Sequence, residues 1–162
     1  MKTYNILFLC THNSARSILG EALASMHASG RFVGYSAGST PGGKVNPFAA
    51  ELALGLGYPQ AKLRSKSWDE FALPDAPQMD FIITVCDNAA GEACPVWPGH
   101  PATAHWGFPD PSQVTGSDDA RRKAFVDVAS GLHKRIDLLA ALPLDTLDNL
   151  SRQAELRRLA TS

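Results

Sequence analysis

Residues 5–23 read NILFLCTHNSARSILGEAL, and this stretch predicts both the start of the fold and a reactive site. The apolar run at residues 5–9 is typical of a short buried strand, and it stops at Cys10. Residues 17–28 carry apolar side chains at helical spacing, which predicts a helix. The inward face of this helix consists of Ile18, Leu19, Ala22, Leu23 and Met26. A polar loop that closes on Arg16 therefore joins a buried strand to a helix.

The rest of the chain alternates between strand and helix patterns. Runs rich in β-branched and aromatic residues predict further strands at 32–37, 79–85 and 102–107. Helical periodicity and capping residues predict helices at 47–56, 65–72, 117–142 and 145–159. In the last of these helices, the residues expected to face inward are Leu147, Leu150, Ala154 and Leu156. The alternation predicts an α/β fold, in which helices cover both faces of a parallel sheet, in a single domain over residues 1–162.

The composition is that of an ordinary globular protein. Hydrophobic residues make up 44% and charged residues 19% of the chain, which argues against disorder. The formal net charge of −1 gives no reason to expect nucleic acid or an anionic membrane as a partner. No apolar run is long enough to cross a bilayer, and the N-terminal apolar run is too short for a signal peptide. We therefore expect a cytoplasmic protein.

The chain has three cysteines, Cys10, Cys86 and Cys94. An odd number without an export signal does not predict a disulfide framework, and such cysteines are more often buried, metal-binding or catalytic. There is no CxxC pair and the histidines are scattered along the sequence, so no metal site is expected. A cysteine after a strand is by itself most often a small core residue. The case for chemistry at Cys10 therefore depends on the loop that comes after it.

Three residues with reactive side chains come directly or soon after predicted strands. Cys10 follows the first strand, Cys86 follows the third, and Asp110 comes just after the fourth. The carboxyl ends of parallel strands share one edge of a sheet, and ligands bind in the crevice at that edge. We therefore expect Cys10, Cys86 and Asp110 to converge there.

The segment from Cys10 to Ser17 has the form C-x5-R-S, and its chemistry suits a tetrahedral oxyanion. The loop residues that would surround the anion are Thr11, His12, Asn13, Ser14, Ala15 and Arg16. Backbone amides at the start of a helix attract an anion, and Arg16 adds a bidentate fork. The same positive field favours the thiolate form of Cys10, and Ser17 can donate a hydrogen bond to that thiolate. Asn13 can hold the loop in shape through contacts of its side chain with the backbone. A thiolate facing a bound oxyanion can attack its central atom, after which Asp110 can protonate the leaving oxygen.

With these segments the sequence resembles the low-molecular-weight phosphatase superfamily and, within it, the arsenate reductases. The resemblance covers nearly the whole chain and is carried by residues 10–17, 84–87, 94–95 and 105–111. It implies a flavodoxin-like four-stranded parallel sheet with flanking helices. It also implies arsenate as the substrate, no bound cofactor, an external thiol reductant and a role in arsenic detoxification.

The two branches of this superfamily differ in the step after the attack by Cys10. In the phosphatases, water hydrolyses a phosphocysteine, and an aromatic residue after the Asp-Pro pair lines a phosphotyrosine slot. Here Ser112 and Gln113 come after that pair, so the aromatic residue that would line such a slot is missing. In the reductases, a second cysteine attacks the first, arsenite leaves and a disulfide remains. The resemblance assigns the role of the second cysteine to Cys86. It assigns to Cys94 the role of a third cysteine, which forms a new disulfide with the second and presents it at the surface.

Other features of the resemblance concern the loop and its surroundings. Many phosphatases have glycine where His12 stands, and many members of both branches have cysteine where Ala15 stands. Cys10 must therefore find its redox partner outside the loop. The reductant stays open between thioredoxin and glutathione with glutaredoxin. Some relatives bind potassium near the loop, and the matching positions of this chain hold Asn13, Glu21 and Ser36.

Three hypotheses about function come from these observations. The first is an arsenate reductase, the second a low-molecular-weight protein tyrosine phosphatase, and the third a non-catalytic, oxyanion-responsive regulator or phosphoprotein-binding module. Cys86 and Cys94 favour the reductase, because hydrolysis needs neither of them. A regulator would lack the nucleophile, the arginine or the acid, and this chain has all three. Residual phosphatase activity is compatible with reduction, because both reactions begin with the same attack.

Overall fold

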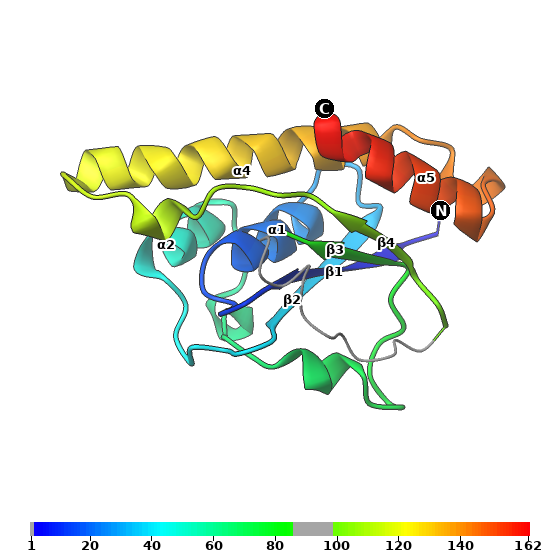
Figure 1. The fold of residues 1–162 in the computed structure, drawn as a ribbon, viewed down its shortest axis with the longest axis horizontal. Coiled ribbons are helices and arrows are strands. Elements are labelled where there is room, and N and C mark those ends of the chain that lie inside the picture. Colours follow the sequence, from blue (N-terminus) through cyan, green and yellow to red (C-terminus); the bar gives the residue numbers. More distant parts are fainter. Residues whose placement is uncertain (1, 86–98) are drawn as a thin grey trace.

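A computed structural model describes residues 2–85 and 99–162, and its centre is a four-stranded parallel sheet (Figure 1). The strands are β1 (Tyr4–Cys10), β2 (Phe32–Gly38), β3 (Phe81–Thr84) and β4 (Ala102–His105). Their order across the sheet is β2-β1-β3-β4, and each neighbouring pair is parallel. The predicted α/β fold with a four-stranded parallel sheet is confirmed. Cys10 lies at the carboxyl end of the central strand β1, as the sequence predicted.

The helices also come in the predicted order. The α-helices are α1 (Arg16–Ser25), α2 (Pro47–Gly55), α4 (Asp118–Ala140) and α5 (Asn149–Arg158). Short 3-10 helices lie at Gln60–Lys62, Trp68–Phe71, Pro111–Gln113, Leu144–Thr146 and Leu159–Thr161. Capping side chains explain where two of the helices begin. The Asn46 side chain accepts a hydrogen bond from a backbone amide in the first turn of α2, and the Ser117 side chain does the same for α4.

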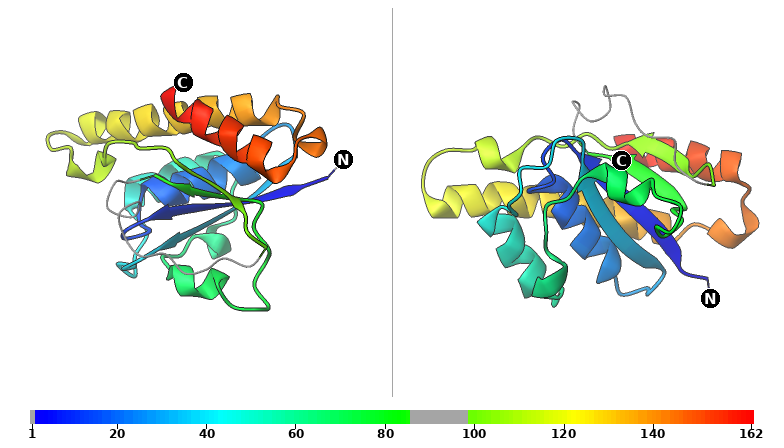
Figure 2. Two further views of the ribbon diagram at one scale, coloured as in Figure 1. Left: turned by 45° about the vertical axis from the view of Figure 1, so that its right-hand side comes forward. Right: turned by 90° about the horizontal axis from the view of Figure 1, so that it is seen from below.

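The two faces of the sheet bury different sets of residues. Ile6 and Phe8 of β1 belong to a core cluster shared with α1, α4 and α5, and in Figures 1 and 2 these helices lie on one side of the sheet. Leu7 and Leu9 point to the other face, because side chains alternate along a strand. That face packs against the 3-10 helix Trp68–Phe71, the short green helix on the far side of the sheet from α4 in Figure 1.

Three local predictions need correction. The first helix ends at Ser25, so Met26 lies beyond it and is 42% exposed. The segment predicted as a helix at 65–72 is a 3-10 helix capped by Ser67. The last helix begins only at Asn149, and Leu150 is 77% exposed. At about 100° per residue, Leu150 and Ala154 lie far around that helix from the buried Leu156, which explains why they do not face the core.

Some predictions lie outside the described residues. Cys86, Cys94 and most of the loop expected between residues 87 and 101 fall in the segment 86–98. Within residues 2–85 and 99–162, no helix combines the length and the apolar character that a membrane span requires.

Candidate active site

The loop after β1 is held from its outer side through its carbonyl groups. The carbonyl oxygens of Thr11, His12 and Ser14 accept hydrogen bonds from backbone amides within residues 40–46, at 2.8, 3.0 and 2.8 Å. In a trans peptide, the N–H of the next residue points away from the carbonyl, and the described residues contain no cis peptide. The amides of residues 12, 13 and 15 are therefore turned away from residues 40–46, and the Asn13 amide points to the Cys10 sulfur, as an anion-binding nest requires.

Cys10 is buried at the base of this loop. Its Sγ lies 2.8 Å from the hydroxyl oxygen of Ser17, and the backbone amide of Asn13 donates to the sulfur at 3.2 Å. The side-chain amide of Asn13 donates to the Ser17 hydroxyl oxygen at 2.8 Å. With this contact made, the Ser17 hydroxyl can donate its own proton to the sulfur when Cys10 is a thiolate. Two donors directed at one sulfur favour its thiolate form.

Asn13 supports this geometry from a backbone conformation that few residues adopt. Its φ of 49° lies in the left-handed region, which asparagine tolerates better than most residues. The side chain is buried, and its Oδ1 accepts from the backbone amide of Lys66 at 2.9 Å. Gly38 at the end of β2 leaves room for the loop, because a Cβ there would lie 2.5 Å from the Thr11 carbonyl oxygen. Asn13 thus connects the loop to a distant part of the chain.

The start of α1 completes the loop. The position before the helix is Ala15, which makes no side-chain capping hydrogen bond. The first-turn amides of a helix have no partner within the helix, and the helix dipole adds a partial positive charge there. The uncapped start of α1 therefore presents amides and positive potential beside Cys10, which suits a bound oxyanion.

Arg16 joins the loop to the segment after β4. One terminal nitrogen of its guanidinium donates to the carbonyl oxygen of Phe108 at 2.9 Å. The other lies 3.6 Å from Oδ2 of Asp110. The side chains of Arg16 and Asp110 are 17% and 29% exposed, so this pair is reachable from solvent but largely shielded. The structure therefore brings Arg16 and Asp110 together, from positions far apart in the sequence.

Behind the loop lies a buried polar network around Glu21. The Glu21 carboxylate accepts from the Ser36 hydroxyl at 2.6 Å and from the hydroxyl of Tyr58. The ammonium of Lys66 lies 3.4 Å from Glu21 Oε1 and 3.3 Å from Ser36 Oγ, and it donates to the Arg64 carbonyl at 2.9 Å. Burial lowers the pKa of Lys66, and the charge of Glu21 opposes that decrease.

This network argues against the predicted potassium site at Asn13, Glu21 and Ser36. Glu21 and Ser36 do lie together, but a lysine ammonium already contacts the oxygens that would bind the ion. The side-chain oxygen of Asn13 is used by the amide of Lys66. A potassium ion here would face a buried positive charge. The residues present therefore do not fit potassium, and no step of the chemistry involves it.

The remaining predicted site residues divide into two groups. His12 is exposed, with its Nδ1 3.2 Å from the Thr40 carbonyl oxygen, and Ala15 is buried. Cys86 and Cys94 lie outside the described residues. Val85, the residue before Cys86, is buried, and its amide donates to the carbonyl of Leu9 at 2.9 Å.

Comparison with known proteins agrees with this arrangement. The family model of the low molecular weight phosphotyrosine protein phosphatases matches residues 5–155. The chain belongs to this family. An arsenate reductase of Halalkalibacterium halodurans is 34% identical over 135 residues, which are 83% of this chain and 94% of that protein.

Two solved structures illustrate the range of the family. The arsenate reductase of Archaeoglobus fulgidus has a TM-score of 0.59 and 26% identity, over 82% of this chain and 98% of that one. The low molecular weight protein tyrosine phosphatase of T. tengcongensis has a TM-score of 0.64 and 20% identity, over 90% and 100% of the two chains. The second likeness shows the fold alone. The fold of this family therefore does not separate a reductase from a phosphatase, and the side chains must do so.

Asp110 is the predicted site residue whose surroundings are most informative. Its burial raises the pKa of the carboxyl, but hydrogen bonds from Ser112 and the charge of Arg16 outweigh burial and bring the pKa below the ordinary value. The Ser112 hydroxyl donates to Oδ1 at 2.7 Å, and the Ser112 amide donates to the same oxygen at 3.0 Å. Asp110 is therefore a carboxylate in the resting protein at neutral pH.

Replacing Ser112 with alanine is expected to raise the pKa of Asp110, because it removes one of the hydrogen bonds that stabilise the carboxylate. A carboxyl whose pKa is depressed by folding stabilises the folded state above its unfolded pKa, and this contribution is lost as the pH falls. The stability difference between the wild type and Ser112→Ala should therefore shrink as the pH falls below the ordinary Asp value of 3.8. Carboxyl NMR titration and urea unfolding measure the two effects.

The matched control for this prediction is Ser130→Ala, which removes an exposed serine hydroxyl from α4. It should leave the Asp110 titration unchanged. An Asp110 titration in Ser112→Ala that coincides with the wild type would show that the hydroxyl does not control the carboxyl.

Sequence reasoning missed three contributors to the site. Lys66 lies in an irregular segment, where no periodicity marks a residue that reaches a buried carboxylate. Phe108 contributes its backbone carbonyl to Arg16, and backbone groups leave no side-chain signal. The sequence marks Ser112 only as a residue that stands where the phosphatases have an aromatic side chain. Its position two residues after Asp110 is a turn signal that predicts a hydrogen bond to the aspartate.

Proposed function

We propose that the protein is an arsenate reductase in which Cys10 is the nucleophile. The observation that carries the first step is the pair of donors from Ser17 and Asn13 on the Cys10 sulfur, beside the uncapped start of α1. The homologues named arsenate reductase, at 34% identity over most of the chain, support arsenate as the oxyanion. Arsenate is a tetrahedral oxyanion that matches the amides of residues 11–16 and the fork of Arg16.

In the first step, the Cys10 thiolate attacks arsenic(V), an S–As bond forms and an oxygen leaves as water. Arg16 and the loop amides hold the negative oxygens and stabilise the charge of the transition state. Asp110 transfers the proton to the leaving oxygen: as a carboxylate it accepts a proton from a second hydroxyl of the diprotonated arsenate anion and passes it to the hydroxyl that leaves as water. Arg16 contacts Asp110, so the residue that transfers the proton lies beside the group that binds the anion.

The state of Asp110 also favours arsenate over a phosphate ester. Hydrolysis of an ester needs a proton on the ester oxygen, and a carboxyl with a lowered pKa is rarely protonated at neutral pH. The diprotonated arsenate anion instead brings both protons of the departing water, one on the leaving hydroxyl and one on a neighbouring hydroxyl. Ser112, which holds Asp110 as a carboxylate, therefore disfavours the phosphatase reaction more than the reductase reaction.

The later steps are a cysteine relay. The Cys86 thiolate attacks the Cys10 sulfur and forms the Cys10–Cys86 disulfide. The S–As bond breaks and its electron pair stays on arsenic, which becomes arsenic(III) and leaves as arsenite. Cys94 then attacks Cys86, so the Cys10 thiolate is released and the Cys86–Cys94 disulfide forms. The chain enters this segment at Val85, whose amide is bonded to Leu9, the residue before Cys10.

The relay leaves a disulfide that an external dithiol must reduce. We propose thioredoxin as the partner that receives it, because a Cys86–Cys94 disulfide is a protein disulfide of the kind that a dithiol protein resolves by exchange. Glutathione with glutaredoxin is the alternative, and it would act on an earlier intermediate. The proposed chemistry uses no bound cofactor and no potassium.

Single-turnover arsenite formation from purified, fully reduced protein tests the relay. Without added reductant, the wild type is expected to release one arsenite per chain. Cys94→Ser should also release one arsenite, because the Cys10–Cys86 disulfide still forms, but it should fail to turn over with thioredoxin. Cys86→Ser should release none, because nothing attacks the arsenic adduct.

Two outcomes would contradict this proposal. Arsenite formation by Cys86→Ser with glutathione and glutaredoxin would keep the reductase and remove the relay. Hydrolysis of para-nitrophenyl phosphate without arsenite formation in any mixture would instead assign the protein to the phosphatase branch. Cys10→Ser is the control that must abolish both reactions.

A further inference from the structure

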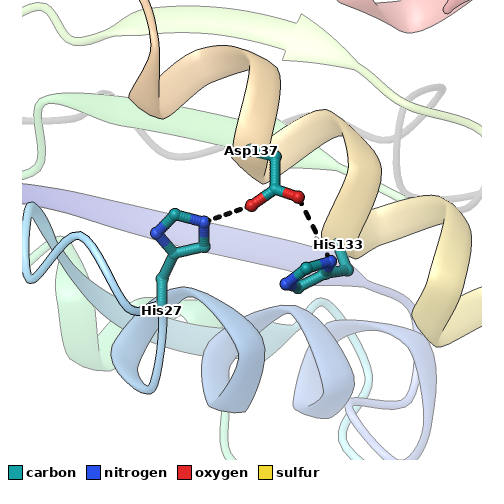
Figure 3. A group of neighbouring side chains, drawn as sticks. All are labelled: His27, His133 and Asp137. Carbon is teal, nitrogen blue, oxygen red and sulfur yellow. Dashed lines mark hydrogen bonds and ion pairs between the residues drawn. The ribbon is translucent and has the colours of Figure 1, made fainter.

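Two histidines and an aspartate meet beyond the end of α1 that is remote from the oxyanion loop (Figure 3). His27 lies just past the C-terminal end of α1, whereas His133 and Asp137 lie one turn apart on α4. His27 Nε2 is 2.5 Å from Asp137 Oδ1, and His133 Nδ1 is 3.4 Å from Asp137 Oδ2. One nitrogen of each ring and a carboxylate oxygen all lie within 4.8 Å of one another.

We propose that His27, His133 and Asp137 bind a zinc ion that links the end of α1 to α4. Two imidazoles and one carboxylate are a donor set that suits zinc, whereas calcium and magnesium prefer oxygen ligands alone. A tetrahedral zinc with bonds of about 2.0–2.2 Å needs ligand atoms about 3.4 Å apart. The separations in the cluster span this value, and the fourth position is left to water.

The exposure of the three side chains fits this role. His27 is only 9% exposed at its side chain, so its ring is held in place by the surrounding protein. The side chains of His133 and Asp137 are 53% and 52% exposed, and they can rotate by the small amount that coordination requires. An ion can therefore enter from solvent and meet one fixed ligand and two adjustable ones.

Ser29 gives His27 a second contact on the far side of its ring. The Ser29 hydroxyl oxygen lies 2.7 Å from Nδ1, and the Ser29 amide donates to the same nitrogen at 3.2 Å. Without metal, this contact leaves the ring proton on Nε2, facing Asp137. When zinc binds Nε2, the ring proton moves to Nδ1. The Ser29 hydroxyl then turns to accept it, and the 3.2 Å contact from the Ser29 amide is given up. The hydroxyl contact orients the histidine ligand.

Zinc binding to the full-length chain is tested by calorimetric titration with zinc chloride, with the cysteines kept reduced by a phosphine. The wild type is expected to bind one zinc ion through this cluster, and His133→Gln and Asp137→Asn should weaken that binding at least tenfold. The melting temperature of the wild type should rise with zinc, because a ligand of the folded state stabilises it. That rise should be lost in both variants.

The control is His100→Asn, which removes an exposed histidine outside the cluster and keeps a residue that tolerates its positive φ of 50°. It should bind zinc like the wild type. X-ray absorption of the loaded protein should show only nitrogen and oxygen ligands, since zinc held by the cysteines would show sulfur at about 2.3 Å. Sulfur in that shell, unchanged affinity in His133→Gln, or no saturable binding up to millimolar zinc would each overturn the proposal.

Discussion

Replacing Arg16 with lysine is expected to lower kcat/KM for arsenate by about 10²–10³-fold, the usual cost of losing a transition-state oxyanion contact. Lysine keeps the charge but not the planar fork that binds two oxygens of one anion. The present contacts of Arg16 with the Phe108 carbonyl and with Asp110 use two separate terminal nitrogens, which a single ammonium cannot reproduce. Steady-state arsenite formation measures the loss.

The control for this experiment is Arg122→Lys. Arg122 is half-exposed on α4, where it pairs with Glu51 on the surface, so its replacement should change kcat/KM by less than about twofold. Urea unfolding should show that Arg16→Lys stays folded. Full activity in a folded Arg16→Lys protein would mean that the fork does not hold the oxyanion.

Replacing Lys66 with methionine is expected to destabilise the protein by about 3–5 kcal/mol, because it leaves the buried charge of Glu21 without its partner. The side chains of Lys66 and Glu21 are only 6% and 5% exposed, so water cannot replace the lost ion pair. The double variant Glu21→Gln/Lys66→Met removes both charges and should recover much of the loss. Urea unfolding of the three proteins measures the coupling between the two side chains.

The same variant tests how the network treats potassium. In the wild type, potassium chloride and sodium chloride at equal concentration should give the same melting temperature and activity, because the Lys66 ammonium already contacts Glu21 and Ser36. In Lys66→Met, potassium has no ammonium to oppose it and should restore part of the lost stability. A potassium-specific stabilisation of the wild type would contradict our assignment of Lys66 as the cation of this network.

The parts of the structure that the sequence predicts are those in which periodicity and spacing are strong. Cys10 lies at the end of a regular strand and Ser17 at the start of a regular helix, so their proximity results from local geometry. Asp110 could be placed at the same edge because the carboxyl ends of parallel strands coincide. These predictions depend on backbone geometry, which short patterns encode well.

The parts that the sequence does not predict arise from contacts between irregular segments. Lys66 reaches Glu21 from a loop far along the chain, and nothing in its neighbours signals that its ammonium is buried. His27 and His133 are distant in sequence and share no metal-ligand spacing, yet the packing of α1 against α4 brings them together at Asp137. Leu150 matched an apolar pattern, but α5 begins only at Asn149, and on this helix Leu150 lies far around from the buried Leu156.

The way the oxyanion loop is held has a consequence for how its sequence can vary. Carbonyls of the loop are tied to peptide amides of residues 40–46, and a peptide group is the same whichever side chain it carries. These three hydrogen bonds therefore place no demand on the side chains of residues 11, 12 and 14, so the exposed His12 can stand in a loop of this shape. Ala15 differs, because its side chain is buried in the core. Side chains at the three tied positions can change the charge around the anion while the backbone that cradles it keeps its curvature.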